Sequence, residues 1–343
     1  MRKLLNTLYV TTPKSYLKLD GENIVILLDD DEKFRIPFVN VESIVCFGYM
    51  GASPALMGKC VDNRVSLSFL KPNGEFLARI SGKTKGSVFL RKKQYLISDD
   101  EDFCLGFAKE IVAAKIYNSR VSVEKTIRDN RDKINVERLE KTSAKLKEAI
   151  KTVYLFNNKD ELRGFEGVQA KQYFSAFDDM LLKQKDKFYF CERSKRPPLD
   201  NVNCLLSYLY TMLSFDITSA LETVGLDPYV GFYHELRSGR ASLAVDLIEE
   251  LRSYMVDRFV ISMINLKQIS ANDFTAKEGG AILMTDEGRR KTLKYWQERK
   301  KDIITHPFIK EKIEIGLIPY VQAQLLARFL RGDLNEYPPF LCK

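Results

Sequence analysis

The sequence predicts an α+β protein, with a small N-terminal β-rich domain followed by a larger all-α domain. Up to about residue 98, apolar and polar side chains alternate with the two-residue period of strands. Beyond an acidic stretch at 99–102, apolar side chains recur every three to four residues, as on amphipathic helices. A chain of 343 residues can hold two domains of roughly 100–200 residues each. We place these domains at 1–98 and 103–343, joined by an acidic linker at 99–102.

Two hairpins organise the predicted β-rich domain. Asp20-Gly21 separates the first pair of strands, and Pro72-Asn73-Gly74 turns the chain between the second pair. Asp-Gly between extended segments is a strong short-range hairpin signal, because glycine accepts the positive φ of a tight turn. The predicted strands cover 15–19, 24–28, 65–69 and 76–80.

Helices fill most of the remaining chain. Ser98 and the aspartates of the acidic linker can cap the first helix, since short polar side chains accept hydrogen bonds from free N–H groups at helix starts. The predicted helices cover 103–128, 136–155, 160–182, 200–223, 239–266 and 319–331.

Charge and hydropathy narrow the possible functions. Lys and Arg outnumber Asp and Glu by 54 to 46, giving a formal net charge of +8. This balance favours a polyanionic partner, because cations that neutralise phosphates release condensed counterions. No uninterrupted stretch of about 18 apolar residues occurs, and the N-terminus lacks a sustained apolar segment. We therefore expect a cytoplasmic protein without membrane contact.

The sequence contains two histidines, and one of them lies beside acidic residues at helical spacing. His234 directly precedes a predicted helix that carries Asp246 and Glu249, which are three residues apart and so lie on one helix face. A histidine and two carboxylates in this arrangement can converge on a divalent ion. Mixed His and carboxylate ligation suits Mn²⁺, and carboxylate-led ligation also suits Mg²⁺.

The same residues allow plainer interpretations. A histidine beside an acidic helix is often part of a solvated surface. Asp246 can pair with a basic neighbour such as Arg240 or Arg252. Glu250 competes with Glu249 for the role of second carboxylate, because positions i and i+4 are also neighbours on a helix.

Glu166 is a further candidate, because it lies between two glycines, Gly164 and Gly167, inside a helical pattern. Each glycine costs roughly 1 kcal/mol relative to alanine in a helix, so the pair needs a reason. One reason is the close approach of a ligand or backbone beside Glu166. The alternative is close helix–helix packing at small residues.

Basic clusters interspersed with tyrosine and phenylalanine suit phosphate contacts with occasional base stacking. Each cluster alone is also compatible with a solvated face. Arg237 and Arg240 stand out because they lie beside the proposed metal site, where a phosphodiester needs charge neutralisation. The DNA-binding candidates are Arg196, Arg237, Arg240, Arg252 and Arg289.

Three segments of the chain follow one another in a characteristic order. The first is Glu166-Gly167 with Tyr173-Phe174, the second is Gly231-Phe232-Tyr233-His234, and the third is Ser242-Leu243 with Asp246 and Glu249; Pro197-Pro198 with Asp200 and Asn203 precedes the second. This ordered set resembles the CRISPR-associated adaptation integrase and endonuclease family, the universal first Cas protein. The closing stretch at 322–340 resembles the type I-C branch of that family.

The resemblance implies that the helical domain is catalytic and that the β-rich domain at 1–98 mediates dimerisation. It implies that Glu166, His234 and Asp246 bind Mg²⁺ or Mn²⁺, with Glu249 as a further ligand or water-positioning group. All four residues are therefore our catalytic and metal-binding candidates.

The resemblance also implies a reaction and partners. A prespacer 3′-hydroxyl attacks a phosphodiester at the repeat boundary of the CRISPR array, which is a transesterification. The implied partners are double-stranded prespacer DNA with 3′ overhangs, CRISPR repeat DNA, a second copy of the chain, and a dimer of the small second adaptation protein. An exonuclease subunit that trims the prespacer is a further partner implied for type I-C loci.

Two other functions stay open on the residues alone. A divalent-metal nuclease without strand joining would use the same ligands, with water as the nucleophile in place of the 3′-hydroxyl. A non-enzymatic DNA-binding scaffold would keep the carboxylates for structure only.

Overall fold

The computed structural model describes residues 7–29, 31–41, 43–48, 50–63, 65–71, 76–80, 82 and 88–342. The chain divides into two compact units. The first takes in residues up to 85 together with Asp286–Asp302 and Glu314–Leu317, and the second takes in the rest. A β-sheet region precedes a mostly helical region, which confirms the predicted fold class.

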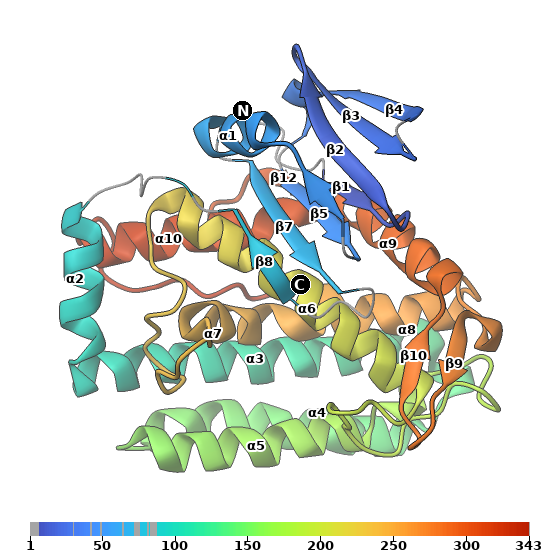
Figure 1. Ribbon diagram of the computed structural model, residues 1–343. Helices are drawn as coiled ribbons and strands as arrows, with labels where there is room; N and C mark the ends of the chain where they lie inside the picture. Colours follow the sequence, from blue (N-terminus) through green and yellow to red (C-terminus); the bar gives the residue numbers. More distant parts are fainter. Residues whose placement is uncertain are drawn as a thin grey trace. The chain divides into compact units, whose positions relative to one another are not determined.

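Two four-stranded sheets form the first unit (Figure 1). The strands are β1 (Thr7–Val10), β2 (Ser15–Asp20), β3 (Asn23–Leu28), β4 (Asp31–Pro37), β5 (Ser43–Phe47), β6 (Gly51–Ala52), β7 (Ser66–Leu70) and β8 (Phe76–Arg79). One sheet has the order β1-β5-β7-β8 and the other has the order β4-β3-β2-β6. Leu17, Ile24, Ile44 and Leu67 come from both sheets and are fully buried in one core.

The first predicted hairpin is confirmed. Asp20 faces Asn23 across an antiparallel pair, and Gly21 between them has a φ of +55°, which a residue with a side chain rarely adopts. β7 and β8 are also antiparallel, as predicted, although the turn at 72–74 lies outside the described residues. Two helices of this unit were not predicted: α1 (Pro54–Asn63) and α9 (Asp286–Lys300).

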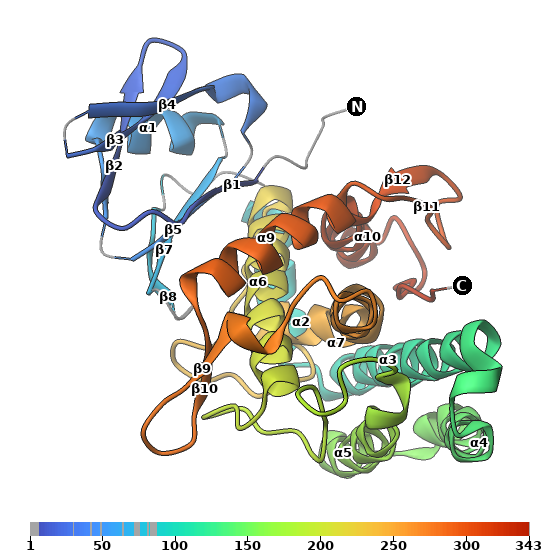
Figure 2. The same cartoon turned by 90° about the vertical axis from the view of Figure 1, so that its right-hand side faces the viewer.

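The second unit is built around α3, which packs against α4, α5 and α7 (Figure 2). Its helices are α2 (Val88–Ser98), α3 (Glu101–Asn130), α4 (Val136–Thr152), α5 (Lys159–Ser175), α6 (Asn201–Val224), α7 (Ser242–Leu251), α8 (Arg258–Asn265) and α10 (Ile318–Arg331). Two short unpredicted sheets pair β9 (Phe274–Ala276) with β10 (Ile282–Met284) and β11 (Ile303–Thr305) with β12 (Lys312–Glu314).

Polar caps set where these helices begin. Asp100 accepts a hydrogen bond from the backbone N–H of Phe103 at 3.0 Å, so the acidic stretch does cap α3. Asn158 caps α5 and Asp200 caps α6 in the same way, through the backbone N–H three residues ahead. These caps fix the starts of α3, α5 and α6, whereas α7, which carries Asp246 and Glu249, begins without a side-chain cap.

The compact units differ from the predicted domain bounds. The first stretch of the β-rich unit ends near residue 85, and α2 belongs with the helices because it packs against α3 and α10. Gln94 on α2 is fully buried and donates to the carbonyl oxygens of Asp227 and Val230, both at 2.8 Å. Residues 101 and 102 lie inside α3, so the predicted linker is reduced to a short turn.

The predicted helix at 239–266 is divided into three parts. α7 ends at Leu251, a π-helical segment covers Arg252–Asp257, and α8 follows. π segments are rare and often occur at functional sites. This one begins three residues after Glu249.

α6 is the apolar centre of the helical unit. By length and composition it could cross a membrane, but 67% of its most apolar window is buried inside the protein. α6 is therefore a core helix, because a helix surrounded by other protein segments is apolar on most sides.

Candidate active site

Two carboxylates from different helices converge on one ammonium group. Glu166 on α5 and Glu249 on α7 both form ion pairs with Nζ of Lys115 on α3, and the distance from Glu249 Oε2 to Nζ is 2.6 Å. The three side chains are 17%, 6% and 16% exposed, respectively. Lys115 therefore joins three helices through charges that are largely withdrawn from water.

Arg252 completes the charge balance around Glu249. Its guanidinium lies 2.9 Å from Glu249 Oε1 and stacks over the ring of Tyr210, with 4.8 Å from Cζ to the ring centroid. Burial alone raises the pKa of Glu249, but Arg252, Lys115 and His234 outweigh burial and lower it. Burial likewise opposes the charge of Lys115, yet Glu249 and Glu166 raise the pKa of its ammonium. Both groups are charged at neutral pH.

His234 is held in place by Asp246. The ring Nδ1 lies 2.7 Å from Asp246 Oδ1, which also accepts the backbone N–H of His234 at 2.9 Å. Asp246 Oδ2 accepts the backbone N–H groups of Phe232 and Tyr233 at 2.7 and 3.0 Å. Asp246 is fully buried, and its two oxygens accept hydrogen bonds from the segment that carries His234. In this structure Asp246 positions His234.

Gly231 is required for that segment to approach α7. A Cβ atom at Gly231 would lie 2.7 Å from Asp246 Oδ2 and 2.7 Å from the carbonyl carbon of Ser242. Contacts this short do not occur in folded proteins, and here one of them is with backbone. The glycine therefore lets the backbone N–H groups reach the carboxylate.

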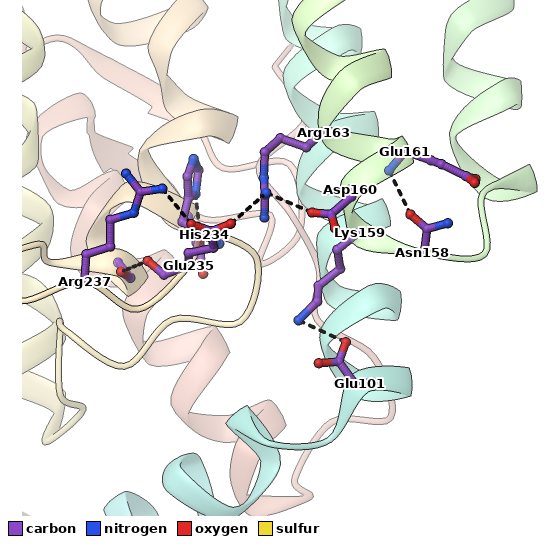
Figure 3. Close-up of polar contacts among 11 residues, drawn as sticks. Glu101, Asn158, Lys159, Asp160, Glu161, Arg163, His234, Glu235 and Arg237 are labelled. Atoms are coloured by element: carbon purple, nitrogen blue, oxygen red, sulfur yellow. Dashed lines mark hydrogen bonds and ion pairs between the residues drawn. The ribbon is translucent and has the colours of Figure 1, made fainter.

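Exposed ion pairs tie α5 to the segment after His234 (Figure 3). Arg163, one turn before Glu166, lies 2.9 Å from Asp160 and 3.2 Å from Glu235, which also pairs with Arg237 at 2.7 Å. Exposed pairs are worth about 0–1 kcal/mol each, so this connection is weak. Burial around Lys115, not these pairs, holds the site together.

Glu250 lies apart from this cluster. Its carboxylate accepts hydrogen bonds from Tyr337 Oη at 2.5 Å, from the backbone N–H of Phe340 at 2.6 Å and from Gln322 Nε2 at 3.1 Å. Burial raises the pKa of Glu250 to about 7. Of the two rival carboxylates, Glu249 is the one that faces Glu166 and Lys115.

The predicted basic residues fall into three groups. Arg252 is part of the buried cluster, while Arg196 and Arg237 are exposed and Arg240 is half-buried beside the His234 segment. Arg289 lies on α9, in the other compact unit, where it pairs with Asp286. Arg237 and Arg252 thus already have acidic partners within the chain.

Gly164 and Gly167 face open space. A Cβ atom at either position would have no neighbour within 4 Å outside its own helix. Close helix packing therefore does not account for these glycines. The two glycines are three residues apart and so share one face of α5, which is not the face of Glu166, because residues one or two apart on a helix do not face each other.

The donor set fits a divalent ion, although the ligands do not stand ready as a closed site. Among the residues that the structure describes, no group of three His, Cys, Asp or Glu side chains is arranged to hold a metal. Asp246 is engaged by the His234 segment, and Lys115 lies between Glu166 and Glu249. Carboxylate oxygens with an imidazole nitrogen are suitable donors for Mn²⁺ or Mg²⁺. Glu249 Oε2 is buried, contacts the Lys115 ammonium and forms no hydrogen bond of good geometry.

Sequence reasoning assigned no site role of their own to Lys115 and Arg193. Arg193 donates to Asn203 Oδ1 at 2.7 Å and to Ser207 Oγ at 2.9 Å, and its guanidinium lies 5.5 Å from the ring centroid of Tyr210. Lys115 had one signal, because it is the single charged residue in the apolar run at 111–116. A charge inside a buried helical stripe needs a partner, but the sequence does not name that partner.

Comparison with known proteins decides the family. The sequence matches the family described as CRISPR associated protein Cas1 over residues 8–298. The CRISPR-associated endonuclease Cas1 1 of Chlorobaculum tepidum is 45% identical over 341 residues, with 99% of each chain covered. The chain belongs to the Cas1 family.

Other Cas1 relatives carry an additional domain. A Cas4 exonuclease/Cas1 endonuclease fusion of Geobacter sulfurreducens is 33% identical over 344 residues, covering 98% of this chain and 60% of the fusion. The resemblance to the CRISPR-associated adaptation family, which the sequence predicted, is confirmed at the level of the family.

Solved structures agree with the Cas1 fold. A casposase bound to its integration product has a TM-score of 0.82 at 21% identity, with 97% of this chain and 92% of that chain covered. A Cas6-RT-Cas1–Cas2 complex has a TM-score of 0.82 at 22% identity, with 99% of this chain and 36% of that chain covered.

Proposed function

We propose that this Cas1 chain is a metal-dependent DNA integrase and endonuclease that inserts prespacer DNA into the CRISPR array by transesterification. The observation that carries the proposal is the convergence of Glu166 and Glu249 on one cation position beside His234. Family membership supports the setting, and the casposase, whose integration product is named, supports strand joining by this fold.

Glu166, His234 and Glu249 are the proposed metal ligands. A divalent ion held there, Mg²⁺ or Mn²⁺, would polarise the scissile phosphate and stabilise charge on the leaving oxygen. Asp246 stays a further proposed ligand; one of its oxygens accepts the Nδ1–H of His234, which leaves Nε2 as the nitrogen that faces a metal. The hydrogen bond between Nδ1 of His234 and Asp246 fixes the tautomer and the direction of the imidazole.

Four cationic side chains surround the carboxylates and are suited to phosphate. They are Lys115, Arg193, Lys195 and Arg252, which interact electrostatically with one another or with Glu249. Preorganised positive charge lowers the free energy of the extra negative charge that develops in phosphoryl transfer. Arg196, Arg237 and Arg240 stay as proposed contacts to the flanking DNA, and Arg289 stays as a candidate on α9.

The proposed partners follow from the family resemblance. The β-rich unit would mediate dimerisation, and it exposes Phe34 and Val39, which are 63% and 86% exposed. Two such dimers would flank a dimer of the small second adaptation protein and carry a prespacer with 3′ overhangs. The Geobacter fusion supports a trimming exonuclease as a further partner. Membership of the type I-C branch and a cytoplasmic location remain predictions.

Strand joining tests the proposed function. The purified chain and its small partner protein receive a labelled prespacer and a supercoiled plasmid that bears the CRISPR leader and repeat, with Mn²⁺ or Mg²⁺. We expect labelled plasmid that disappears with chelator and in His234→Ala. Asp160→Asn, an exposed change on α5, serves as the control that keeps activity.

The other outcomes select the alternatives. Cutting of plasmid or prespacer without joining would identify a plain divalent-metal nuclease. DNA binding with no chemistry in any protein, wild type included, would identify a scaffold. Equal joining by His234→Ala would remove His234 from the site and contradict the proposal.

A further inference from the structure

Lys115 occupies an unusual place for a lysine. It lies in the buried stripe of α3, between Ala114 and Ile116, which are 1% and 2% exposed. Its ammonium contacts Glu166 from α5 and Glu249 from α7. A charge that is withdrawn from water in this way persists only when opposite charges compensate it.

The two carboxylates equally need a cation. Glu249 is 6% exposed on its side chain and Glu166 is 17% exposed, and both face the same point. Two ionised carboxylates that share a site repel each other unless a positive charge lies between them. An ammonium and a hydrated divalent ion are both compact cations that prefer oxygen partners. One position therefore suits either of them.

We infer that Lys115 is a built-in placeholder cation, which holds Glu166 and Glu249 in position and must leave before a divalent ion can bind them. This inference rests on the proposed metal site. Binding of the ion and pairing of Lys115 are mutually exclusive. The site is thereby preorganised without metal, and its affinity for metal is set by the competition.

The structure offers Lys115 a place to move. A cavity of about 30 Å³ adjoins it, lined by Glu166, Tyr210, Arg252 and Asp257 among others. A volume of this size accommodates about one or two waters or a small cationic group. Arg252 keeps its own contact with Glu249 Oε1, so departure of the ammonium leaves that carboxylate oriented.

Calorimetric titration with Mn²⁺ tests the inference on the full-length chain. Lys115→Met keeps the length of the side chain and removes the charge. Because apparent affinity falls in proportion to the fraction of competent protein, we expect Lys115→Met to bind Mn²⁺ about tenfold more tightly or better. Without metal the variant should unfold at a lower temperature than wild type, and Mn²⁺ should restore much of the difference.

Lys195→Met is the matched control. Lys195 is exposed, and its charge acts on Glu249 and Lys115 from nearby without forming an ion pair with either. Its removal reports simple charge repulsion, for which we expect a change of at most about threefold. Equal tightening in Lys195→Met and Lys115→Met, or none in Lys115→Met, would overturn the placeholder role.

Two further measurements separate this inference from the metal site itself. Wild type should bind Mn²⁺, and the Glu166→Gln variant should not. If the variant binds Mn²⁺ as wild type does, the proposed metal site is wrong and the inference fails with it. The second measurement is trace acetylation of lysines in the wild-type protein, quantified by mass spectrometry, and it requires no substitution at Lys115. Labelling of Lys115 should rise severalfold when Mn²⁺ is added, and unchanged labelling would show that the ammonium never leaves the carboxylates.

Discussion

At the scale of single residues, Asp246 shows how one buried carboxylate can orient a neighbouring side chain of the candidate site. It accepts three backbone N–H groups and the ring Nδ1 of His234, and it is fully buried on α7. Its negative charge is compensated by these donors, so the imidazole is fixed in one orientation. The chemistry assigned to His234 thus depends on a neighbour twelve residues further along the chain.

Asp246→Asn should both destabilise the fold and misdirect His234. The amide has one acceptor oxygen and a donor group that would face the backbone N–H donors. Hydrogen bonds to a charged group are worth about 1.5–3 kcal/mol each, so we expect a loss of about 2 kcal/mol in the free energy of unfolding. Urea unfolding measures the loss, and Mn²⁺ titration should show weaker binding. Equal stability and binding in Asp246→Asn and Asp160→Asn would contradict the positioning role.

Alanine substitution at two glycines should change the free energy of unfolding in opposite directions. Gly231→Ala places a Cβ atom 2.7 Å from Asp246 Oδ2, and overpacking of this kind costs about 1–3 kcal/mol. Gly167→Ala fills open space on α5 and should raise the free energy of unfolding by about 0.5–1 kcal/mol, because alanine favours the helix. Thermal unfolding of both variants checks the signs. A stable Gly231→Ala protein would show that the His234 segment packs differently.

At the scale of elements, the C-terminal segment is held by two helices of the candidate active site, α3 and α7. Glu250 on α7 binds Tyr337 and the backbone of Phe340, and Asn118 on α3 donates to Phe340 and accepts the backbone N–H of Cys342. Glu250 directly follows Glu249, so one turn of α7 serves both the site and the C-terminal segment. Loosening of that segment should therefore disturb the position of Glu249.

The titration of Glu250 should make stability depend on pH. Its pKa is about 7 in the folded chain and 4.5 for an ordinary glutamate, so the folded state holds a proton that the unfolded chain has lost. Its contribution to stability is complete below pH 4.5 and is lost as pH rises to about 7. Relative to wild type, Glu250→Gln should gain about 2–3 kcal/mol in the free energy of unfolding between pH 5 and pH 8.

Urea unfolding at several pH values checks this prediction. Glu148→Gln, an exposed change on α4, is the control and should follow wild type at each pH. A constant difference between Glu250→Gln and wild type would mean that Glu250 does not titrate in this range.

Two of the helices were missed for different reasons. α9 has few apolar residues apart from Leu293 and Trp296, so its sequence shows no apolar stripe. α2 follows a β-rich region and contains three consecutive basic residues at 91–93. Its helical pattern was therefore not recognised, although Leu90 and Gln94 are buried in it. Long periodic helices such as α3 and α6 were predicted almost to the residue, because periodicity and caps agree there.

At the scale of the whole molecule, the net charge is positive, whereas positive and negative side chains in the candidate site largely compensate each other. The chain carries a net charge of +8, while the ammonium and guanidinium groups near Glu249 are partly neutralised by carboxylates. If the chain binds DNA as proposed, exposed residues such as Arg196 are therefore expected to supply much of the affinity. Their effect is expected to depend on salt more than that of the buried cluster does.

Salt dependence of DNA binding tests this separation. Arg196→Gln and Arg240→Gln should each reduce the slope of log affinity against log salt by about 1, because each removes one phosphate contact. Arg128→Gln, at the exposed end of α3, removes the same charge and should leave the slope unchanged. Fluorescence anisotropy with a labelled duplex measures all three. Equal slopes in all variants would exclude Arg196 and Arg240 as phosphate contacts.

The candidate site could be predicted in part. Glu166, His234, Asp246 and Glu249 do come from the elements that meet around α3, and the resemblance placed them together. The roles within the group could not be read from spacing, since Asp246 and Glu249 lie on the same helix face. What separates them is tertiary contact: Asp246 meets backbone N–H groups across a glycine, and Glu249 meets a lysine from another helix.

The π segment at Arg252–Asp257 makes the length of this helix as important as its composition. A π turn accommodates one more residue than an α turn, so deletion of a single residue there would restore a regular α-helix. Side chains beyond the π turn would keep their direction around the axis, because the π turn takes up the extra residue locally. Arg252, which pairs with Glu249, and Asp257, which accepts Tyr210 Oη at 2.5 Å, would then be four residues apart, a spacing that also places them on one face of an α-helix. Loss of one residue between these two positions is therefore expected to be tolerated, whereas a deletion elsewhere in α7 or α8 would rotate every later side chain by about 100°.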